Sequence, residues 1–339
     1  MNSAAAHLVG IAGAEIEFTC NVDDTVLRAA QRAGIGFPYE CNVGSCGNCK
    51  FELIAGELAT AWPEAPGWTD KDRQRKRHLG CQSRPLGDCQ IKLRTDARYL
   101  PRHRPQRVSA RLERSRDLTH DMREFRFVLE RPLAFEPGQY ALARLTGVTG
   151  LRAYSMSNTD AQPGVWEFQV RRLPAGQGTA ALFDELRPGT AIELDGPYGM
   201  AWLRRDAPRD ILCLAGGSGL APMISIARGT FAEPQLRSRR LHFIYGGRTP
   251  SDLCGQDMLE ALPGWAERGS YRAFVSTPQP AGSTHETGFV HEAAQRLHGD
   301  ALKEMEIYFA GPPVMAQAVQ RMLIDAGVPP AQQHFDQFY

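Results

Sequence analysis

Four cysteines in the N-terminal third of the chain carry its clearest chemical signal. Cys41, Cys46 and Cys49 follow the spacing C-x4-C-x2-C in a glycine-rich loop, and Cys81 stands alone further along. Thiolates are the usual ligands of iron–sulfur clusters, and this spacing is the plant-type pattern of a [2Fe–2S] site. Zinc is the alternative, but zinc sites usually show two paired cysteine knuckles. The spacing therefore predicts a [2Fe–2S] cluster held by these four cysteines.

The remaining cysteines are expected to have no metal. Cys89 could replace Cys81 as the fourth ligand, although Cys81 has the better setting in the segment Leu-Gly-Cys-Gln. Otherwise Cys89 is expected to join Cys20, Cys213 and Cys254 as a small core residue. A framework of disulfides is not expected, because the sequence shows no export signal.

A second motif consists of Arg152, Ala153, Tyr154 and Ser155, preceded by a Pro-Gly-Gln-Tyr segment that ends at Tyr140. Both segments resemble the ferredoxin–NADP reductase superfamily, whose R-x-Y-S motif binds flavin. The resemblance implies that the tyrosine ring stacks on the isoalloxazine, the hydroxyl lies near flavin N5 and the arginine neutralises the pyrophosphate.

Further flavin contacts are expected downstream of this motif. A glycine-rich segment opens a helix whose N-terminal N–H groups could hold the FAD phosphates. The expected additional contacts are Gln169, Val170, Arg171, Gly176, Gly178 and Thr179. A core tyrosine is the alternative interpretation of Tyr154.

A third motif follows an apolar strand and opens a helix. Its glycines would let the backbone approach a pyrophosphate at the helix N-terminus. It resembles the G-G-x-G-x-[AT]-P variant of the same superfamily, and Gly311 and Pro312 fit a tight turn that faces the dinucleotide. The family often has cysteine where Ala310 stands, so no thiol is expected to assist hydride transfer here. The expected contacts of the third motif are Gly216, Gly217, Ser218, Gly219 and Pro222.

Two residues after a later strand bear on coenzyme choice. Asp252 could accept a hydrogen bond from a ribose hydroxyl, which favours NADH, whereas Arg248 could pair with a 2′-phosphate. The resemblance favours NADH. The chain ends on Phe338 and Tyr339, which could cover the flavin until nicotinamide displaces them, or could form a packed tail.

These motifs fall into three regions that differ in their predicted secondary structure. Residues 1–97 read as a small α+β domain of the ferredoxin (β-grasp) type, and residues 98–106, rich in proline and arginine, read as a solvated linker. Residues 107–206 show many short strands with turn signals, which predicts a barrel or a sandwich. The resemblance of the flavin motif implies an antiparallel β-barrel for FAD. Residues 207–339 alternate strands and helices, which predicts a doubly wound parallel sheet for NAD. The arginines of the linker could alternatively form a docking patch for an acidic partner.

Composition excludes several other classes of protein. The 339 residues carry a net charge of +1, and no apolar run approaches the length of a membrane span. No basic recognition region is evident, so neither nucleic acid nor a membrane is an expected partner. A cytoplasmic monomer is the default expectation.

Taken over the whole chain, the order of domains resembles the reductase components of bacterial multicomponent aromatic-ring oxygenases, of the carbazole dioxygenase, toluene monooxygenase and benzoate dioxygenase type. The resemblance implies an NADH-dependent oxidoreductase that passes electrons from NADH to FAD, to the cluster, and on to a terminal oxygenase or its ferredoxin. The cofactors would supply the chemistry, so no catalytic nucleophile or general base is expected. The alternatives are a reductase of the same build for a cytochrome P450 or another acceptor, a non-enzymatic iron–sulfur redox sensor, and a zinc-stapled binding protein.

Overall fold

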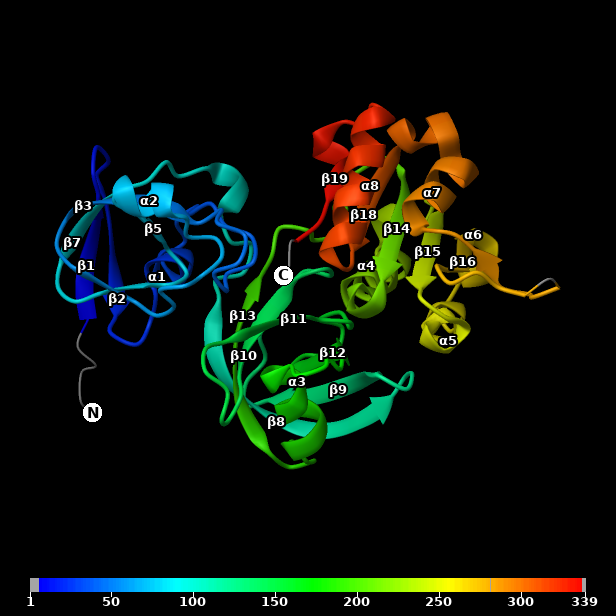
Figure 1. Ribbon diagram of the computed structural model, residues 1–339, viewed down its shortest axis with the longest axis horizontal. Helices are drawn as coiled ribbons and strands as arrows, with labels where there is room; N and C mark the ends of the chain where they lie inside the picture. The colour runs from blue at the N-terminus through cyan, green and yellow to red at the C-terminus, as the bar shows by residue number, and fades with distance from the viewer. Residues whose placement is uncertain (1–5, 281, 337–339) are drawn as a thin grey trace.

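The structure, a computed structural model, describes residues 6–280 and 282–336. Figure 1 shows three bodies in chain order: an N-terminal body in blue and cyan, a green barrel below it, and a third body running from yellow-green to red. None of the described helices is long and apolar enough to cross a bilayer. The fold class predicted from the sequence, with its three different architectures, is confirmed.

The N-terminal body is a five-stranded mixed sheet in the order β2-β1-β7-β3-β5, packed against one helix. Its elements are β1 (Ala6–Ile11), β2 (Ile16–Asn21), α1 (Val26–Arg32), β3 (Lys50–Ala55), β4 (Leu58–Thr60), α2 (Asp70–Gln74), β5 (Arg77–Leu79), β6 (Ser83–Pro85) and β7 (Cys89–Lys92). Strand β1 was not predicted from the sequence. This short strand lies inside the sheet because it pairs in parallel with β7, far along the chain.

The middle body is a six-stranded antiparallel sheet in the order β11-β10-β13-β8-β9-β12. An isolated bridge between Met156 and Phe168 ties the β11 end to β12, so the sheet is nearly closed into a barrel. Its elements are β8 (Gln106–Asp117), β9 (Met122–Leu129), β10 (Tyr140–Arg144), β11 (Arg152–Ser155), β12 (Val165–Arg171), α3 (Gln177–Ala180), a π-helical turn (Ala181–Glu185) and β13 (Ala191–Tyr198).

The third body is a six-stranded parallel sheet in the order β17-β16-β15-β14-β18-β19. Both faces of its central strand are buried, because Ile211 and Cys213 pack with the core around α4 while Leu212 and Leu214 pack with that around α7 and α8. Its elements are β14 (Asp210–Gly216), α4 (Leu220–Ala232), β15 (Leu241–Gly247), α5 (Gln256–Glu260), α6 (Trp265–Arg268), β16 (Gly269–Val275), β17 (Glu286–Thr287), α7 (Val290–His298), β18 (Met305–Ala310), α8 (Pro313–Asp325) and β19 (Gln333–His334).

The predicted linker keeps its arginines exposed, but specific contacts hold it against both neighbouring bodies. Gln31 Nε2 donates to the carbonyl of Tyr99 at 3.3 Å, while Arg102 and His103 each lie 3.3 Å from the Glu136 carboxylate of the barrel. Burial would raise the pKa of Glu136, but hydrogen bonds from His103 and Arg205 outweigh it and lower that pKa to about 2. The like charges of the linker do not repel it from the barrel surface, because the buried Glu136 carboxylate supplies the opposite charge.

A buried ion pair fixes the N-terminal body against the barrel. Arg32 at the end of α1 reaches Asp195 in β13 with two parallel bonds of 2.9 and 2.7 Å. Its Nε also donates to Asp24 Oδ2 at 2.8 Å. Both carboxylates are almost fully buried, and a bidentate pair of this kind restricts geometry as well as adding energy. The two bodies therefore have a defined relative placement.

Candidate functional site

The loop between α1 and β3 brings the four motif cysteines together with β5. Cys49 Sγ lies 3.4 Å from Cys81 Sγ, although the two residues are far apart in sequence. Cys41, Cys49 and Cys81 are buried, Cys46 is half-buried, and all four are free thiols. This arrangement offers a compact set of sulfur ligands with one edge toward solvent.

Polar groups around these sulfurs fit a negatively charged cluster. The backbone N–H of Cys46 points to Cys41 Sγ at 3.3 Å, that of Asn48 to Cys46 Sγ at 3.5 Å, and Gln82 Nε2 to Cys81 Sγ at 3.6 Å. Such donors stabilise thiolate ligands and tune a cluster's potential. The donor set therefore fits a [2Fe–2S] cluster, the group that the sequence predicts here.

The other cysteines lie away from this loop. Cys20 and Cys89 are buried in β2 and β7, Cys213 is buried in β14, and Cys254 is half-buried with its Sγ 3.9 Å from Tyr245 Oη. Desolvation raises the pKa of Cys89, as expected for a thiol in an apolar core. Their surroundings match the prediction that they pack as small core residues.

The flavin motif on β11 meets the glycine-rich segment at the end of the barrel. A Cβ added at Gly178 would lie 3.0 Å from Arg152 Cγ and 3.2 Å from Tyr154 Oη, so glycine keeps a hollow open between them. The Arg152 guanidinium donates only to loop carbonyls of Thr149 and Leu151. Within the described chain it has no carboxylate partner. A guanidinium without a carboxylate partner, beside a glycine hollow, suits the pyrophosphate of FAD.

The neighbouring flavin candidates already have contacts within the protein. Thr179 Oγ1 donates to the Gly176 carbonyl at 3.0 Å and accepts from Leu173 N, so it closes the loop before α3. Val170 packs in the barrel core. Gln169 is buried, and its Nε2 lies 3.4 Å from Glu124 Oε2 and 3.2 Å from Met258 Sδ of the third body.

The register between β10 and β11 shows on which face of the sheet the other residues of the flavin motif lie. Ala153 lies opposite Leu142 and Ser155 lies opposite Tyr140 in the β10–β11 pair. Directly opposed residues of an antiparallel pair project from the same face of the sheet. Ser155 and Tyr140 therefore share the face on which Tyr140 packs with the N-terminal body.

Both nicotinamide motifs meet at the carboxyl edge of the parallel sheet. The glycine turn that contains Ser218 follows β14, and Pro222 lies in the first turn of α4. A Cβ on Gly219 would lie only 2.0 Å from the Ala310 carbonyl oxygen, and one on Gly311 would lie 3.3 Å from the Gly216 oxygen. Ligands of open parallel sheets bind at this edge. The close backbone approach fits a dinucleotide pyrophosphate, with Pro312 capping α8 beside it.

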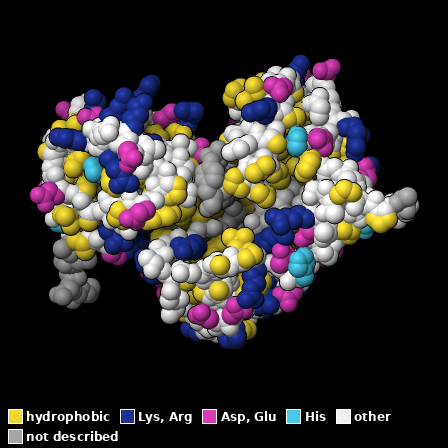
Figure 2. All heavy atoms as spheres, in the orientation of Figure 1, with side chains coloured by type: hydrophobic (Ala, Val, Ile, Leu, Met, Phe, Trp, Pro, Cys, Tyr) yellow, Lys and Arg dark blue, Asp and Glu magenta, His cyan; other side chains and the backbone are white. Residues whose placement is uncertain are grey.

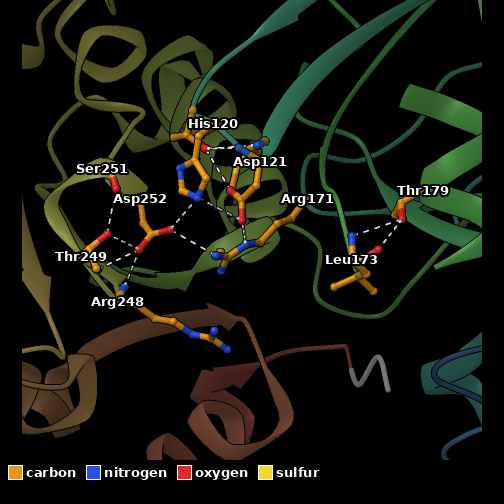
Figure 3. Close-up of polar contacts among 12 residues, drawn as sticks. His120, Asp121, Arg171, Leu173, Thr179, Arg248, Thr249, Ser251 and Asp252 are labelled. Carbon is orange, nitrogen blue, oxygen red and sulfur yellow. Dashed lines mark hydrogen bonds and ion pairs between the residues drawn. The ribbon is translucent and has the colours of Figure 1, made fainter. Parts of the chain in front are cut away.

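Asp252 belongs to a network that sequence reasoning missed (Figure 3). Its Oδ2 accepts from Arg248 N at 3.1 Å and from Thr249 N at 2.8 Å, and its Oδ1 accepts from Arg171 Nη2 at 3.1 Å. Arg171 also donates to Asp121 of the barrel at 2.6 Å. Burial alone would raise the pKa of Asp252, but the Thr249 hydrogen bonds and the Arg171 charge lower it.

This network joins the barrel to the third body through Arg171. Because both oxygens of Asp252 already have partners, its role as a ribose acceptor stays a prediction. The Arg248 side chain is exposed and, in Figure 3, extends away from the network. Among the described residues it has no ion pair. No local sequence signal could reveal the network, since Asp121, Arg171 and Asp252 come from three distant segments.

The end of the chain approaches the junction of the bodies. Phe335 stacks on Phe309 with ring centroids 4.6 Å apart, and Asp336 Oδ1 accepts from Met200 N at 3.0 Å. The predicted flavin contacts Phe338 and Tyr339 lie outside the described residues.

Comparison with known families agrees with these three sites. The 2Fe-2S iron-sulfur cluster binding domain matches residues 9–86, the oxidoreductase FAD-binding domain matches residues 109–202, and the oxidoreductase NAD-binding domain matches residues 213–321. Together these domains define an oxidoreductase that uses FAD, a nicotinamide dinucleotide and a [2Fe–2S] cluster.

Relatives of the whole chain define the family. The chain is 37% identical over 330 residues to the ferredoxin–NAD(P)+ reductase CarAd of Metapseudomonas resinovorans, covering 95% of this chain and 96% of that protein. It is 39% identical over 324 residues to the ferredoxin–NAD+ reductase component of an alkene monooxygenase system of Xanthobacter autotrophicus, covering 95% and 97%. The chain therefore belongs to the family of ferredoxin–NAD(P)+ reductases that form the reductase components of oxygenase systems.

Solved structures agree over the full length. The ferredoxin reductase in carbazole 1,9a-dioxygenase superposes with a TM-score of 0.91 at 34% identity, covering 99% of both chains. A cytochrome P450 reductase of Amycolatopsis superposes with a TM-score of 0.84 at 29% identity, covering 98% of both.

Proposed function

We propose that this protein takes a hydride from NADH onto FAD and passes the electrons singly through its [2Fe–2S] cluster to a terminal oxygenase or its ferredoxin. One observation carries the proposal: candidate residues for flavin and for nicotinamide lie next to each other across the boundary between the barrel and the third body. A Cβ on Gly217 would lie 3.5 Å from Arg171 Nη1, at the end of the strand that follows the flavin motif. A candidate residue of each site thus lies next to one of the other, which supports the close approach that direct hydride transfer requires.

The proposed roles follow the geometry described above. Cys41, Cys46, Cys49 and Cys81 hold the cluster, and Arg152 with the segment around Gly178 holds the FAD pyrophosphate. The glycine turn after β14 and the turn after β18 hold the dinucleotide. The remaining predicted contacts are proposed to line these same sites. We propose domain limits of 1–97, 107–206 and 207–339, joined by residues 98–106.

When bound, FAD supplies the conversion between two-electron and one-electron chemistry, which neither NADH nor the cluster can perform alone. The residues of this chain orient the groups and exclude water between them. Arg171 contributes by fixing the barrel to the nicotinamide body through Asp121 and Asp252.

An anaerobic NADH titration of the purified protein tests this function. Flavin and cluster absorbance should bleach together, and low-temperature EPR should show the rhombic signal of a reduced cluster. Flavin bleaching without a cluster signal would contradict the proposed electron route. A protein that stays oxidised in excess NADH would contradict the reductase function itself.

Coenzyme choice gives a first prediction at Arg248. We expect NADH to be preferred over NADPH, and Arg248→Ala to weaken NADPH by roughly tenfold while changing NADH less, since only NADPH offers the 2′-phosphate that an arginine binds. Steady-state kcat/KM for both coenzymes provides the measurement. An equal loss for both coenzymes would place Arg248 on a group that the two share.

An exposed basic stretch suggests how the electron acceptor docks. The segment that leads to α2 packs on the cluster loop, because Gly67 N donates to the Gly44 carbonyl at 3.0 Å. Arg75, Lys76 and Arg77 follow α2, are exposed, and have no ion pair within the described chain. Figure 2 shows Lys and Arg side chains gathered along the upper rim of the N-terminal body. Free positive charge close to the cluster would attract an acidic partner.

Charge reversal tests this docking surface. The double change Arg75→Glu and Arg77→Glu should slow electron transfer to the acceptor by roughly tenfold at low salt, with the difference shrinking at high salt. Arg237→Glu with Arg240→Glu is the matched control, because these exposed arginines lie on the nicotinamide body. Equal electron-transfer rates for the two double variants would contradict the proposal that the acceptor docks on this stretch.

A cytochrome P450 is the second candidate acceptor. The full-length similarity to a cytochrome P450 reductase supports it, and the docking assay separates the candidates if purified oxygenase, ferredoxin and P450 components are compared. The acceptor reduced fastest by the wild-type protein, and most affected by charge reversal, is the physiological class.

A further inference from the structure

A buried tyrosine joins the flavin-binding strand to the cluster loop. Tyr140 is the first residue of β10 and is fully buried. Its hydroxyl donates to the backbone carbonyl of Glu40 at 2.5 Å. Glu40 immediately precedes Cys41, the first cysteine of the cluster motif, so one hydrogen bond and one peptide link separate the ring from that cysteine.

The same residue is also paired with a flavin candidate through its strand. Tyr140 lies opposite Ser155 in the register of β10 and β11, and Ser155 is the residue proposed to contact flavin N5. Tyr140 therefore stands between the two redox sites and contacts an element of each.

The surrounding contacts hold this junction rigid. Gly199 N donates to Tyr39 Oη at 3.0 Å, which fastens the residue before Glu40 to the barrel. Tyr198 packs between the two, with its ring centroid 6.0 Å from that of Tyr140 and 6.2 Å from that of Tyr39. The nearby Arg32–Asp195 pair closes the same interface. A buried, closely packed junction keeps donor and acceptor at a constant separation, on which electron-transfer rates depend steeply.

We propose that Tyr140 is the positioning residue for electron transfer from flavin to cluster, acting through its hydrogen bond to the Glu40 carbonyl beside Cys41. This inference rests on the proposed function and adds the route between its two cofactors. NADH becomes NAD⁺, its two electrons cross this junction one at a time to the cluster and then the acceptor, and one proton is released. No further oxidant or reductant is needed.

Stopped-flow reduction of Tyr140→Phe by excess NADH tests the route. Flavin bleaching reports hydride transfer, and the lag until the cluster bleaches reports the step across the junction. We expect the lag to lengthen roughly fivefold to tenfold, the factor that one net hydrogen bond is worth. An unchanged lag overturns the proposal, as does an equal slowing of both steps, which would assign Tyr140 to the flavin site.

A matched control separates the hydrogen bond from general loosening. Tyr198→Phe removes another buried hydroxyl from the same interface, one that donates to Asp195 Oδ1 at 3.1 Å and not to the cluster loop. We expect its lag to stay near the wild-type value, and an equally long lag overturns the proposal. EPR of each variant after reduction by dithionite should show the full cluster signal, and its loss in Tyr140→Phe overturns the proposed route. Wild-type protein in which NADH never reduces the cluster would instead refute the proposed function.

Discussion

Replacement of Cys81 by serine should abolish the reduced-cluster EPR signal while leaving the bleaching of flavin by NADH intact. Serine offers a harder oxygen ligand that suits an iron–sulfur cluster poorly. Loss of outer contacts alone weakens metal sites roughly 10- to 100-fold, so loss of a direct ligand should cost at least as much. Reduction of a one-electron protein acceptor should therefore fall to the level supported by flavin alone.

Cys89→Ser is the matched control for this experiment, because Cys89 is the alternative fourth ligand and is buried in strand β7 of the same body. We expect Cys89→Ser to retain the EPR signal, since Cys81 and not Cys89 lies against Cys49. Iron and sulfide content of both variants provides a second readout. A reversed pattern would exchange the two cysteines in the ligand set, and retention of the cluster in both would contradict a four-cysteine site.

Local patterns predicted much of this molecule because they report on local geometry. The apolar strand and the helix expected on either side of the third motif correspond to β14 and α4, where an apolar run, a glycine turn and a helix follow each other directly. The same holds for the cysteine loop, whose spacing fixes the ligands within a few residues of one another. Here the chemistry and the fold are encoded in one short segment.

Long-range pairing was beyond such patterns. Strand β1, which was not predicted, lies inside the sheet because it pairs with β7, and the arginine-rich linker is held to the barrel through the buried Glu136. Likewise, the sequence does not show that Arg171 and the Thr249 turn already bind both oxygens of Asp252, the predicted ribose acceptor. In each case the partner that decides the outcome lies in another element, so no window of sequence contains both.

In the glycine turn of the nicotinamide site, residues from distant segments touch through their backbones. Of all single methyl groups that could be added to this turn, the one in Gly219→Ala should have the largest effect. The added Cβ would lie 2.0 Å from the oxygen and 2.3 Å from the carbon of the Ala310 carbonyl. Both contacts are backbone, so neither can rotate away. Overpacking of this kind costs about 1–3 kcal/mol or more in free energy of unfolding.

The functional consequence should exceed the loss of stability, because relief of the clash must move the turn after β14 away from the end of β18, at the edge where the dinucleotide is proposed to bind. Each 1.4 kcal/mol of lost binding energy weakens NADH about tenfold, so KM for NADH should rise by at least roughly that factor. Thermal unfolding and steady-state kinetics provide the measurements. Gly87→Ala is the control, since a Cβ there meets nothing within 4 Å and both quantities should stay at their wild-type values. A Gly219→Ala protein with wild-type KM would show that this turn does not bind the coenzyme, whereas a raised KM with unchanged flavin and cluster spectra would locate the defect at the nicotinamide site alone.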